Sequence, residues 1–403
     1  MGSAKWYNTP MPVPPSIYDL TFEQLAEQIA AWGEPSYRAR QVWEGLYHRL
    51  YETPGQFSNL PRNLRQKLGE DFALASPAPT PGPSPLGGGD SNTDMGVESA
   101  AIPTGAVQPG QLTFSRLQPI RLLESSDGET RKSLFRLPDG RPLEAVLMRY
   151  ERRRTLCISS QSGCAMGCTF CATGQMGFGR HLTSGEIVEQ VLYYARLLAA
   201  QGEQVTNVVL MGMGEPFHNY EATLAAIDRL NDPRGINLGE RRFTISTVGL
   251  VPMIRRFAAE KRQVNLAISL HAAEDELRSS MLPVNRRYPI AELMVACREY
   301  LQRTHRRLTF EWALIHSVND TPEQARKLGA LLRTLDLDGA VLCHVNAIPL
   351  NPTHKFAGKA TDRQRAHAFK AELERLGIPC TIRLRRGIDI QAGCGQLAGE
   401  STG

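Results

Sequence analysis

Three cysteines lie close together in the segment Cys164-Ala-Met-Gly-Cys168-Thr-Phe-Cys171, directly after a predicted strand. A loop with this spacing places three thiolates around one corner of an iron–sulfur cube and leaves the fourth iron without a protein ligand. A structural zinc site needs four ligands in a closed tetrahedron, and neither a second cysteine pair nor a nearby histidine completes one here. Zinc and a set of inert buried thiols remain the alternatives to an iron–sulfur cluster.

A glycine-rich loop, Met211-Gly-Met-Gly-Glu215-Pro216, follows the predicted strand from Val205 to Leu210. Its glycines, Gly214 among them, let a ligand approach the backbone closely, and the Glu215 carboxylate beside them accepts hydrogen bonds from an ammonium group. A plain tight turn accounts for the same residues equally well. The position of the loop one strand after the cysteine loop favours a ligand-binding role.

Polar residues also stand at the ends of later predicted strands: Ser246, the run Ser269-Leu270-His271, and Asn351. Hydroxyl, imidazole and amide groups that share one rim suit a ribose and a carboxylate. Each of these residues taken alone is more typical of an ordinary polar strand end. The group as a whole is a candidate cofactor site.

Two single cysteines complete the set. Cys157 lies on the predicted strand before the cysteine cluster, and Cys394 lies in a loop whose flanking glycines expose its sulfur. The other three, Cys297, Cys343 and Cys380, fall within apolar helix or strand patterns, where a free cysteine behaves as a small hydrophobic residue. We assign those three no function.

The composition indicates the class of protein that carries these residues. The chain has 403 residues, of which 42% are hydrophobic and 22% charged, values typical of a globular protein with one or two accessory pieces. No apolar stretch is long enough to cross a bilayer, and residues 1–15 lack the pattern of a signal peptide, so we expect a cytoplasmic protein. A net charge of +5 permits an anionic partner but does not argue for one.

The elements of the N-terminal part follow from periodicity and composition. Thr21 and Gln24 form a capping box that starts one helix, and a second helix is expected from Tyr37 to about Tyr51. Residues 75–112 are rich in Pro and Gly and contain no Lys or Arg, which predicts a flexible insertion. Residues 113–150 alternate in strand fashion and predict a small β unit.

From Thr155 onward, short apolar or β-branched runs alternate with helical segments. The runs lie near Leu156, Val208, Ile245, Ile268, Trp312, Val341 and Ile382. Helices are predicted between them, one after the capping box of Thr183 and Glu186, one from Ile290, and one over residues 361–376. This alternation predicts a parallel sheet, and six or seven strands favour an incomplete barrel over a closed eight-stranded one. The predicted fold class is therefore α/β, an incomplete TIM-like β/α barrel.

The spacing of the three cysteines resembles that of the radical S-adenosylmethionine (SAM) enzymes. The full set of motifs resembles the RlmN/Cfr family of radical SAM RNA adenine methyltransferases, and most of all its RlmN branch. This resemblance covers the chain except residues 1–15 and 75–112. The segments that carry it are Glu34 to Gln41, Thr155 to Cys164, Met211 to Pro216, Ser269 to Ala272 and Gly393 to Leu397.

The resemblance implies a division of the chain and a set of cofactor ligands. It implies an N-terminal helical RNA-binding unit over 1–74, the insertion over 75–112, a small β extension over 113–150, and the radical SAM partial barrel over 151–403. A 4Fe-4S cluster would be held by Cys164, Cys168 and Cys171. The expected SAM contacts are Gly214, Glu215, Ser246, Ser269, Leu270, His271 and Asn351.

The same resemblance implies a radical mechanism that uses two SAM molecules per turnover, because carbon 2 of adenine is electron-poor and not nucleophilic. One SAM would methylate Cys394, and the cluster would cleave a second to make a radical on that methyl group. After addition to adenine, Cys157 would attack the Cys394 sulfur and release the product as a disulfide forms. Glu144 stands in the place of the family's proton acceptor, although its position in an alternating strand alone indicates only an ordinary polar residue.

The implied partners are 23S rRNA near the peptidyl transferase centre, tRNA at the adenine after the anticodon, and a low-potential flavodoxin- or ferredoxin-like electron donor. We expect a monomer. Basic groups available for phosphate are Arg38, Arg40, Arg49, Arg152 to Arg154, Arg241, Arg242 and Arg383 to Arg386. Three alternatives stay open: methylation at carbon 8 as in the Cfr branch, a non-catalytic iron–sulfur RNA-binding or electron-transfer protein, and a radical SAM enzyme acting on a small molecule.

Overall fold

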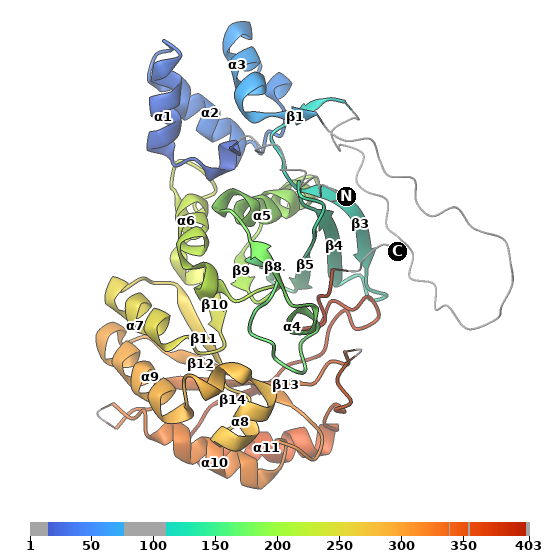
Figure 1. Ribbon diagram of the computed structural model, residues 1–403, viewed down its shortest axis with the longest axis vertical. Helices are drawn as coiled ribbons and strands as arrows, with labels where there is room; N and C mark the ends of the chain where they lie inside the picture. Colours follow the sequence, from blue (N-terminus) through green and yellow to red (C-terminus); the bar gives the residue numbers. More distant parts are fainter. Residues whose placement is uncertain (1–14, 76–109, 338, 354, 400–403) are drawn as a thin grey trace, which may run out of the picture.

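The computed structural model describes residues 15–75, 110–337, 339–353 and 355–399 (Figure 1). Residues 15–75 form a helical unit at the top of Figure 1. Its elements are η1 (Ile17–Asp19), α1 (Phe22–Ala31), α2 (Tyr37–Tyr47), η2 (Pro54–Gln56) and α3 (Arg62–Phe72).

The predicted starts of the first two helices are confirmed. Helix α1 follows the capping box of Thr21 and Gln24, in which each side chain accepts a hydrogen bond from the other residue's backbone N–H. Helix α2 begins at Tyr37 as predicted but ends at Tyr47, about one turn before the predicted end. The chain turns away there because Leu50 adopts a left-handed backbone conformation with φ of 60°, which a continuing helix does not allow.

Most of the predicted insertion, residues 76–109, lies outside the described residues. Its two ends lie side by side, because β1 (Leu74–Ala75) pairs antiparallel with β2 (Leu112–Thr113). The insertion therefore leaves and re-enters the fold at one place.

One large sheet contains ten strands within the described part of the chain. Its order is β14-β13-β12-β11-β10-β9-β6-β5-β4-β3, and pairing is parallel from β6 to β14 and antiparallel from β6 to β3. This confirms the α/β class and the incomplete barrel, with all seven predicted runs present as parallel strands. The strands are β3 (Gln118–Glu124), β4 (Thr130–Arg136), β5 (Pro142–Tyr150), β6 (Arg153–Cys157), β9 (Asn207–Leu210), β10 (Phe243–Thr247), β11 (Asn265–Ser269), β12 (Leu308–Leu314), β13 (Cys343–Pro349) and β14 (Cys380–Ile382).

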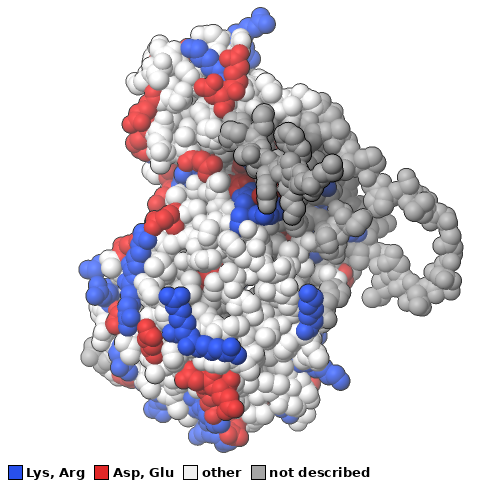
Figure 2. Space-filling view, in the orientation of Figure 1, with Lys and Arg blue, Asp and Glu red and all other residues white. Residues whose placement is uncertain are grey.

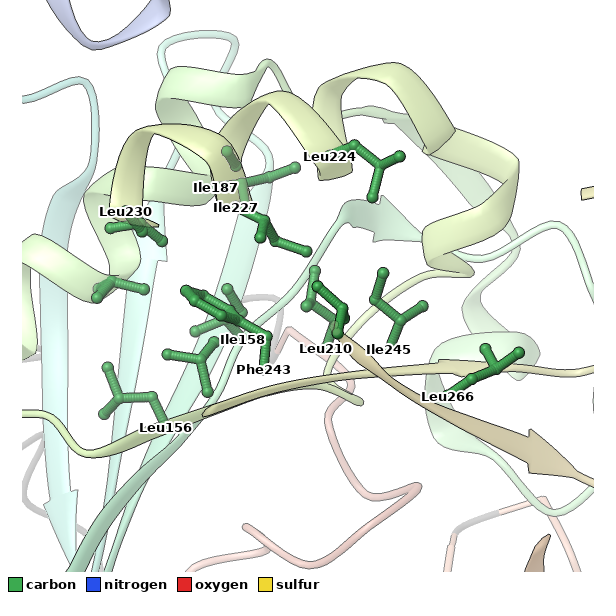
Figure 3. Close-up of a cluster of buried hydrophobic side chains, with 14 of the residues drawn as sticks. Leu156, Ile158, Ile187, Leu210, Leu224, Ile227, Leu230, Phe243, Ile245 and Leu266 are labelled. Carbon is green, nitrogen blue, oxygen red and sulfur yellow. The ribbon is translucent and has the colours of Figure 1, made fainter. Parts of the chain in front are cut away.

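Helices connect the parallel strands and cover the outer face of the sheet (Figure 1). They are α5 (Ser184–Ala199), α6 (Tyr220–Asn231), α7 (Val251–Glu260), α8 (Asp275–Met281), α9 (Ile290–Thr304), α10 (Pro322–Arg333) and α11 (Arg363–Arg375), with the short turns η3 (Pro216–Asn219), η4 (Glu240–Arg242) and η5 (Pro283–Arg286). Figure 3 shows the core that joins both layers, in which Ile187 and Ile227 point from α5 and α6 toward Leu156, Leu210 and Ile245 on the strands.

Partly buried polar contacts fix the N-terminal unit to the barrel. The Asp19 carboxylate accepts hydrogen bonds from the Gly185 backbone N–H (2.6 Å) and the Ser184 hydroxyl (3.0 Å) at the start of α5. On the next helix, Arg229 donates to the Leu20 carbonyl at 2.9 Å. Because these contacts are partly buried, parting the two units would leave several groups unpaired. Every helix in the described part of the chain is too short or too polar to cross a bilayer.

Candidate active site

A two-stranded hairpin, absent from our sequence-based expectations, brackets the cysteine loop. Strand β7 (Gln161–Gly163) leads into Cys164, and β8 (Phe178–His181) follows the short helix α4 (Ala172–Met176). The Cys164 backbone N–H donates to the Gly177 carbonyl at 2.9 Å. A Cβ atom on Gly163 would lie only 2.1 Å from that carbonyl oxygen, so the close approach of the two strands requires glycine.

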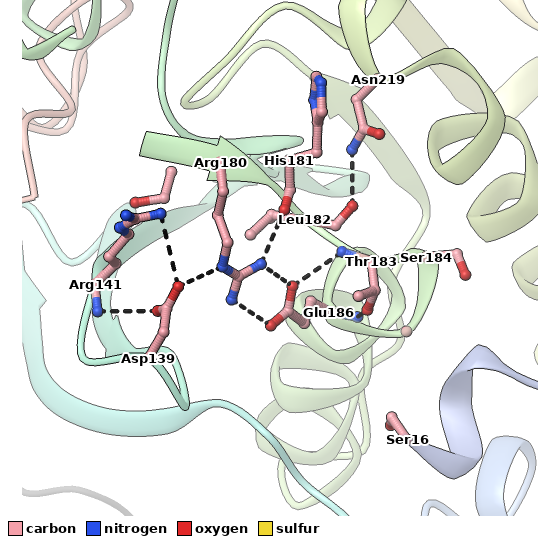
Figure 4. A network of polar contacts seen from close by, with 12 residues as sticks. Ser16, Asp139, Arg141, Arg180, His181, Leu182, Thr183, Ser184, Glu186 and Asn219 are labelled. Atoms are coloured by element: carbon pink, nitrogen blue, oxygen red, sulfur yellow. Dashed lines mark hydrogen bonds and ion pairs between the residues drawn. The ribbon is translucent and has the colours of Figure 1, made fainter. Parts of the chain in front are cut away.

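Arg180 ties this hairpin to its surroundings. Its guanidinium makes two 2.7 Å hydrogen bonds to the two carboxylate oxygens of Glu186 and one of 2.6 Å to Asp139 (Figure 4). Glu186 also accepts from the Thr183 backbone N–H in the predicted capping box that starts α5. Bidentate arginine–carboxylate pairs are directional, so the arm of the hairpin that follows the cysteine loop is held in a defined position.

The three thiols of the loop line one pocket at the carboxyl ends of the parallel strands. Cys164 and Cys168 are buried and Cys171 is partly exposed. Among the described residues, no three His, Cys, Asp or Glu side chains surround a single ion position. Three thiols on one loop fit a cubane cluster, whose thiolates bind three different irons, whereas structural zinc takes four ligands on one ion.

The glycine-rich loop forms the pocket wall next to the cysteines. Met211, Gly212, Gly214 and Glu215 all line it. The Glu215 carboxylate is buried and accepts from the backbone N–H groups of Phe217 (3.0 Å) and Val248 (2.8 Å). Burial raises the pKa of Glu215 to about 7, and these hydrogen bonds oppose the shift by favouring the charged form. A carboxylate held in this way suits an ammonium group in the pocket.

Replacing Gly214 with alanine is expected to weaken SAM binding about five- to 150-fold. Gly214 has φ of 104°, and a Cβ there would lie 2.6 Å from the Cβ of Gln161, whose side-chain oxygen accepts from the Glu215 N–H at 2.8 Å. Overpacking of this kind costs about 1–3 kcal/mol, and about 1.4 kcal/mol corresponds to tenfold. Equilibrium dialysis with labelled SAM measures the effect.

Gly202→Ala is the matched control for Gly214→Ala. Gly202 also has positive φ, but nothing lies within 4 Å of its added Cβ, and it lies outside the pocket. It should therefore lose some stability and keep its SAM affinity. Equal affinities for Gly214→Ala and the wild type would contradict the assigned role of this loop.

The strand-end residues divide into two groups. Ser246, Ser269, His271 and Asn351 line the pocket, whereas Leu270 is fully buried in the apolar core and does not reach it. The reason is alternation along the backbone, which turns Leu270 away when its two neighbours face the pocket. As a side-chain contact to SAM, Leu270 is not supported by this placement.

His271 is held as a neutral donor. Its Nδ1 accepts from the Ala313 N–H at 2.9 Å, so the proton of the neutral ring lies on Nε2. Burial lowers the pKa of His271 to about 3, with Arg278 adding to the shift. Its backbone adopts φ of 59°, an uncommon value for a residue with a side chain.

Hydrogen bonds from several elements hold the loop that carries Cys394. The Asn351 side chain donates to the Cys394 carbonyl (3.0 Å), and the Ala172 N–H donates to the Gly395 carbonyl (2.7 Å) next to the cysteine cluster. Cys394 is exposed and lines the same pocket as the three clustered thiols. The two cysteine loops are thus linked directly through backbone contacts.

Cys157 lies behind this pocket on β6, and its side chain does not line the pocket wall. Although the Cys394 residue is exposed, the protein atoms around its thiol raise its pKa well above the usual range through desolvation, and the Cys157 thiol is the next cause. Cys157 pairs in register with Val209 on β9, and Met211, two residues farther along the chain, lines the pocket that also holds Cys394. The fold therefore brings together two cysteines that are far apart in the sequence.

Glu144 is a buried carboxylate on β5, next to β6 in the sheet. Its Oε1 lies 3.3 Å from the Lys132 ammonium of β4, and its Oε2 accepts from the Ala398 N–H at 3.1 Å. Burial raises the pKa of Glu144, and Lys132 opposes that shift. Glu144 does not line the pocket of the three thiols, but its bond to Ala398 ties it to the Cys394 loop.

Sequence reasoning missed two charged residues near the site. Lys132, which pairs with Glu144, is buried despite its charge. Its position on the inward face of an alternating strand could have indicated this burial from the sequence. Glu311 lines the pocket from β12 within an otherwise apolar run, which was a comparable signal.

Two family models match the chain. The Radical SAM superfamily model covers residues 158–328, and the model of the ribosomal RNA large subunit methyltransferase N-terminal domain covers residues 16–74. The matched ranges correspond to most of the parallel part of the barrel and to the N-terminal helical unit.

Curated relatives match nearly the whole chain. A probable dual-specificity RNA methyltransferase RlmN from Chloroflexus aurantiacus is 44% identical, and the alignment covers 95% of this chain and 93% of the relative. The dual-specificity RNA methyltransferase RlmN 1 of Myxococcus xanthus is 45% identical, with 95% and 94% covered.

A solved structure agrees with these matches. The crystal structure of a radical SAM methyltransferase from Sphaerobacter thermophilus superimposes with a TM-score of 0.82 at 45% identity, and covers 96% of this chain and 100% of that one. These matches confirm the predicted class, a radical SAM RNA methyltransferase. They favour it over a non-catalytic iron–sulfur protein and over a radical SAM enzyme that acts on a small molecule. With both units matched at this level, the chain belongs to the RlmN family of radical SAM RNA methyltransferases.

Proposed function

We propose that the chain methylates carbon 2 of adenine in 23S rRNA and in tRNA, with Cys394 as the carrier of the transferred carbon. Superfamily membership implies a 4Fe-4S cluster and SAM, and Cys164, Cys168 and Cys171 are the residues that would hold the cluster. The cluster supplies one-electron cleavage of SAM when bound. Two SAM molecules per turnover, a flavodoxin- or ferredoxin-like donor and a monomeric state belong to the same proposal.

The observation that carries the proposal is the convergence of five cysteines from three segments. Cys394 lines the pocket of the three clustered thiols, and Cys157 lies at the end of β6, paired with Val209 just before the pocket residue Met211. In the proposed reaction the Cys394 sulfur binds the carbon and then the RNA. Cys157 attacks that sulfur, a disulfide forms, and the bond between sulfur and the product carbon breaks.

Glu144 is the proposed acceptor of the proton that leaves the adenine ring. A carboxylate that is shielded from water, and whose pKa is raised by burial, takes up a proton near neutral pH more readily than an exposed one. Its neighbour Lys132 keeps it charged until then, and its bond to Ala398 directs it toward the Cys394 loop.

The proposed RNA contacts draw on basic residues that the fold brings together. The guanidinium of Arg386 lies over the Tyr150 ring at 4.6 Å, and that of Arg153 approaches the same ring at 5.0 Å. Arg149 and Arg154 pair with Glu203, whereas Arg153 and Arg385 are exposed. The face in Figure 2 shows basic side chains scattered among acidic ones, so local groups such as this one are the better candidates for phosphate contact.

A mass-spectrometric map of the modified adenines tests this function. Purified enzyme with cluster, SAM and an electron donor is incubated with unmodified 23S rRNA fragments and tRNA. We expect 2-methyladenosine in both RNAs. Modification at carbon 8 would assign the chain to Cfr-type chemistry, and labelling of only one RNA would remove the dual specificity from the proposal.

A further inference from the structure

Glu311 is a buried carboxylate to which the proposed reaction gives no role. It lies on β12, is 5% exposed, and lines the pocket that holds Cys394 and the three clustered thiols. In the parallel sheet it pairs in register with Ser269 on one side and Asn346 on the other. Glu311 therefore reaches the pocket from β12, which lies between β11 and β13 in the sheet.

A chain of hydrogen bonds orients the Glu311 side chain. Asn346 donates to Oε1 of Glu311 at 3.0 Å, and Arg383 donates to the Asn346 side-chain oxygen at 3.1 Å. Within the described residues, Oε2 of Glu311 has no hydrogen-bond partner. One carboxylate oxygen is thus fixed, and the other is available to a group in the pocket.

The other ionisable groups around the pocket do not offer a comparable acceptor. The Glu215 carboxylate, whose two oxygens accept backbone N–H groups, is the acceptor already assigned to an ammonium group, and Nδ1 of His271 accepts from Ala313. Glu144 is paired with Lys132 and does not line the pocket. Among the carboxylates that line the pocket in the described part of the chain, Glu311 is therefore the one with an oxygen that accepts no hydrogen bond.

Cys394 needs such an acceptor. A thiolate is the nucleophilic form of cysteine, and the protein raises the pKa of Cys394, with the Glu311 charge among the causes. At neutral pH the thiol thus keeps its proton unless a neighbouring base removes it as the sulfur attacks. The charged or titratable groups around Glu311 are Arg383, directly after β14, His271 at the end of β11, and Cys394 itself.

We propose that Glu311 accepts the thiol proton of Cys394, directly or through one water molecule, when Cys394 is methylated. The Cys394 sulfur forms a bond to the methyl carbon of SAM while the bond from that carbon to the sulfonium sulfur breaks. S-adenosylhomocysteine leaves, and the proton moves to Glu311. The inference rests on the proposed function, because it requires Cys394 to carry the methyl group.

The test measures methylation of Cys394 without RNA and without an electron donor, so that only this displacement takes place. Cluster-loaded enzyme is mixed with SAM bearing a trideuterated methyl group. Mass spectrometry of the peptide containing Cys394 then follows the unmodified fraction with time. In Glu311→Gln we expect the rate to fall about 100-fold or more, the usual effect of losing a positioned base.

The direction of the change separates a base from a mere charge. Removing a nearby negative charge lowers the pKa of a thiol, so Glu311→Gln would methylate as fast as the wild type or faster if Glu311 acted only through its charge. That result overturns the inference and leaves the proposed function intact. Absence of methylation on wild-type Cys394 would overturn both.

A second variant and a binding measurement guard against simple structural damage. Asn346→Ala keeps the carboxylate but removes the hydrogen bond that lowers its pKa. In the wild type the rate of Cys394 methylation should rise with pH around the pKa of Glu311, which is about 7. In Asn346→Ala the midpoint of that rise should lie at a higher pH. An unshifted midpoint would count against Glu311 as the titrating base. SAM affinity should stay within about threefold in Glu311→Gln, and a larger loss would indicate a binding role instead.

Discussion

Cys157→Ala is expected to stop turnover and leave RNA covalently attached to Cys394. The fold places Cys157 and Cys394 at the same end of the sheet, and in the proposed reaction no other thiol attacks the sulfur that holds the RNA. Denaturing gels should show protein that migrates with RNA and returns to its normal position after nuclease treatment. Mass spectrometry should find the adenine on the peptide that contains Cys394, and product release should fall by at least about a thousandfold.

The pH dependence of the release step gives a further check on the same prediction. Desolvation raises the pKa of Cys157 to about 12, so only a small fraction is thiolate at neutral pH. Because the thiolate is the attacking form, release in the wild type should accelerate about tenfold per pH unit wherever this step limits the rate. Normal turnover by Cys157→Ala, with no adduct at any pH, would remove Cys157 from the mechanism.

Cys168→Ala is expected to abolish both the iron–sulfur chromophore and SAM cleavage. Cys168 is 8% exposed and packs in an apolar cluster with Met281 and Leu282, so no water ligand is well placed to replace it. The purified variant should lack the brown colour and the broad absorbance near 400 nm, and activity should fall below detection. Iron and sulfide analysis after anaerobic reconstitution measures the loss directly.

Cys297→Ala is the matched control for the loss of a cluster ligand. Cys297 is also fully buried but lies on α9 within the apolar core, away from the pocket. It should keep its colour and activity and lose only some stability through the small cavity. A colourless, fully active wild-type enzyme that contains only zinc would refute the cluster assignment.

The sequence was sufficient for features that depend on local patterns. Capping boxes at Thr21 and Thr183 start their helices as expected, because the side chains that satisfy the first backbone N–H groups lie within four residues. The seven parallel strands were visible as apolar runs, since strands covered on both faces need apolar residues throughout. The predicted end of α2 was too late. A left-handed residue that ends a helix is usually a glycine, which the sequence would reveal, but here that conformation falls on Leu50.

The candidate site was only partly predictable. The cysteine spacing predicted the cluster ligands. Alternation at the end of β11, however, keeps Leu270 out of the pocket, and the sequence predicted neither the β7–β8 hairpin nor the role of Glu311 in the pocket wall. Whether a polar residue faces a pocket or the core depends on which side of the sheet its strand presents there.

By itself, the sequence determined which residues are chemically able to act: three clustered thiols, two single cysteines and a set of strand-end polar groups. Tertiary structure alone decided which of them meet. Cys157 and Cys394 reach the same end of the sheet because β6 ends there and the C-terminal loop is held there by Asn351, and Glu144 acquires Lys132 as a partner because β4 pairs with β5. Proximity between distant segments depends on how the whole sheet curves and pairs, and no local pattern encodes that distance.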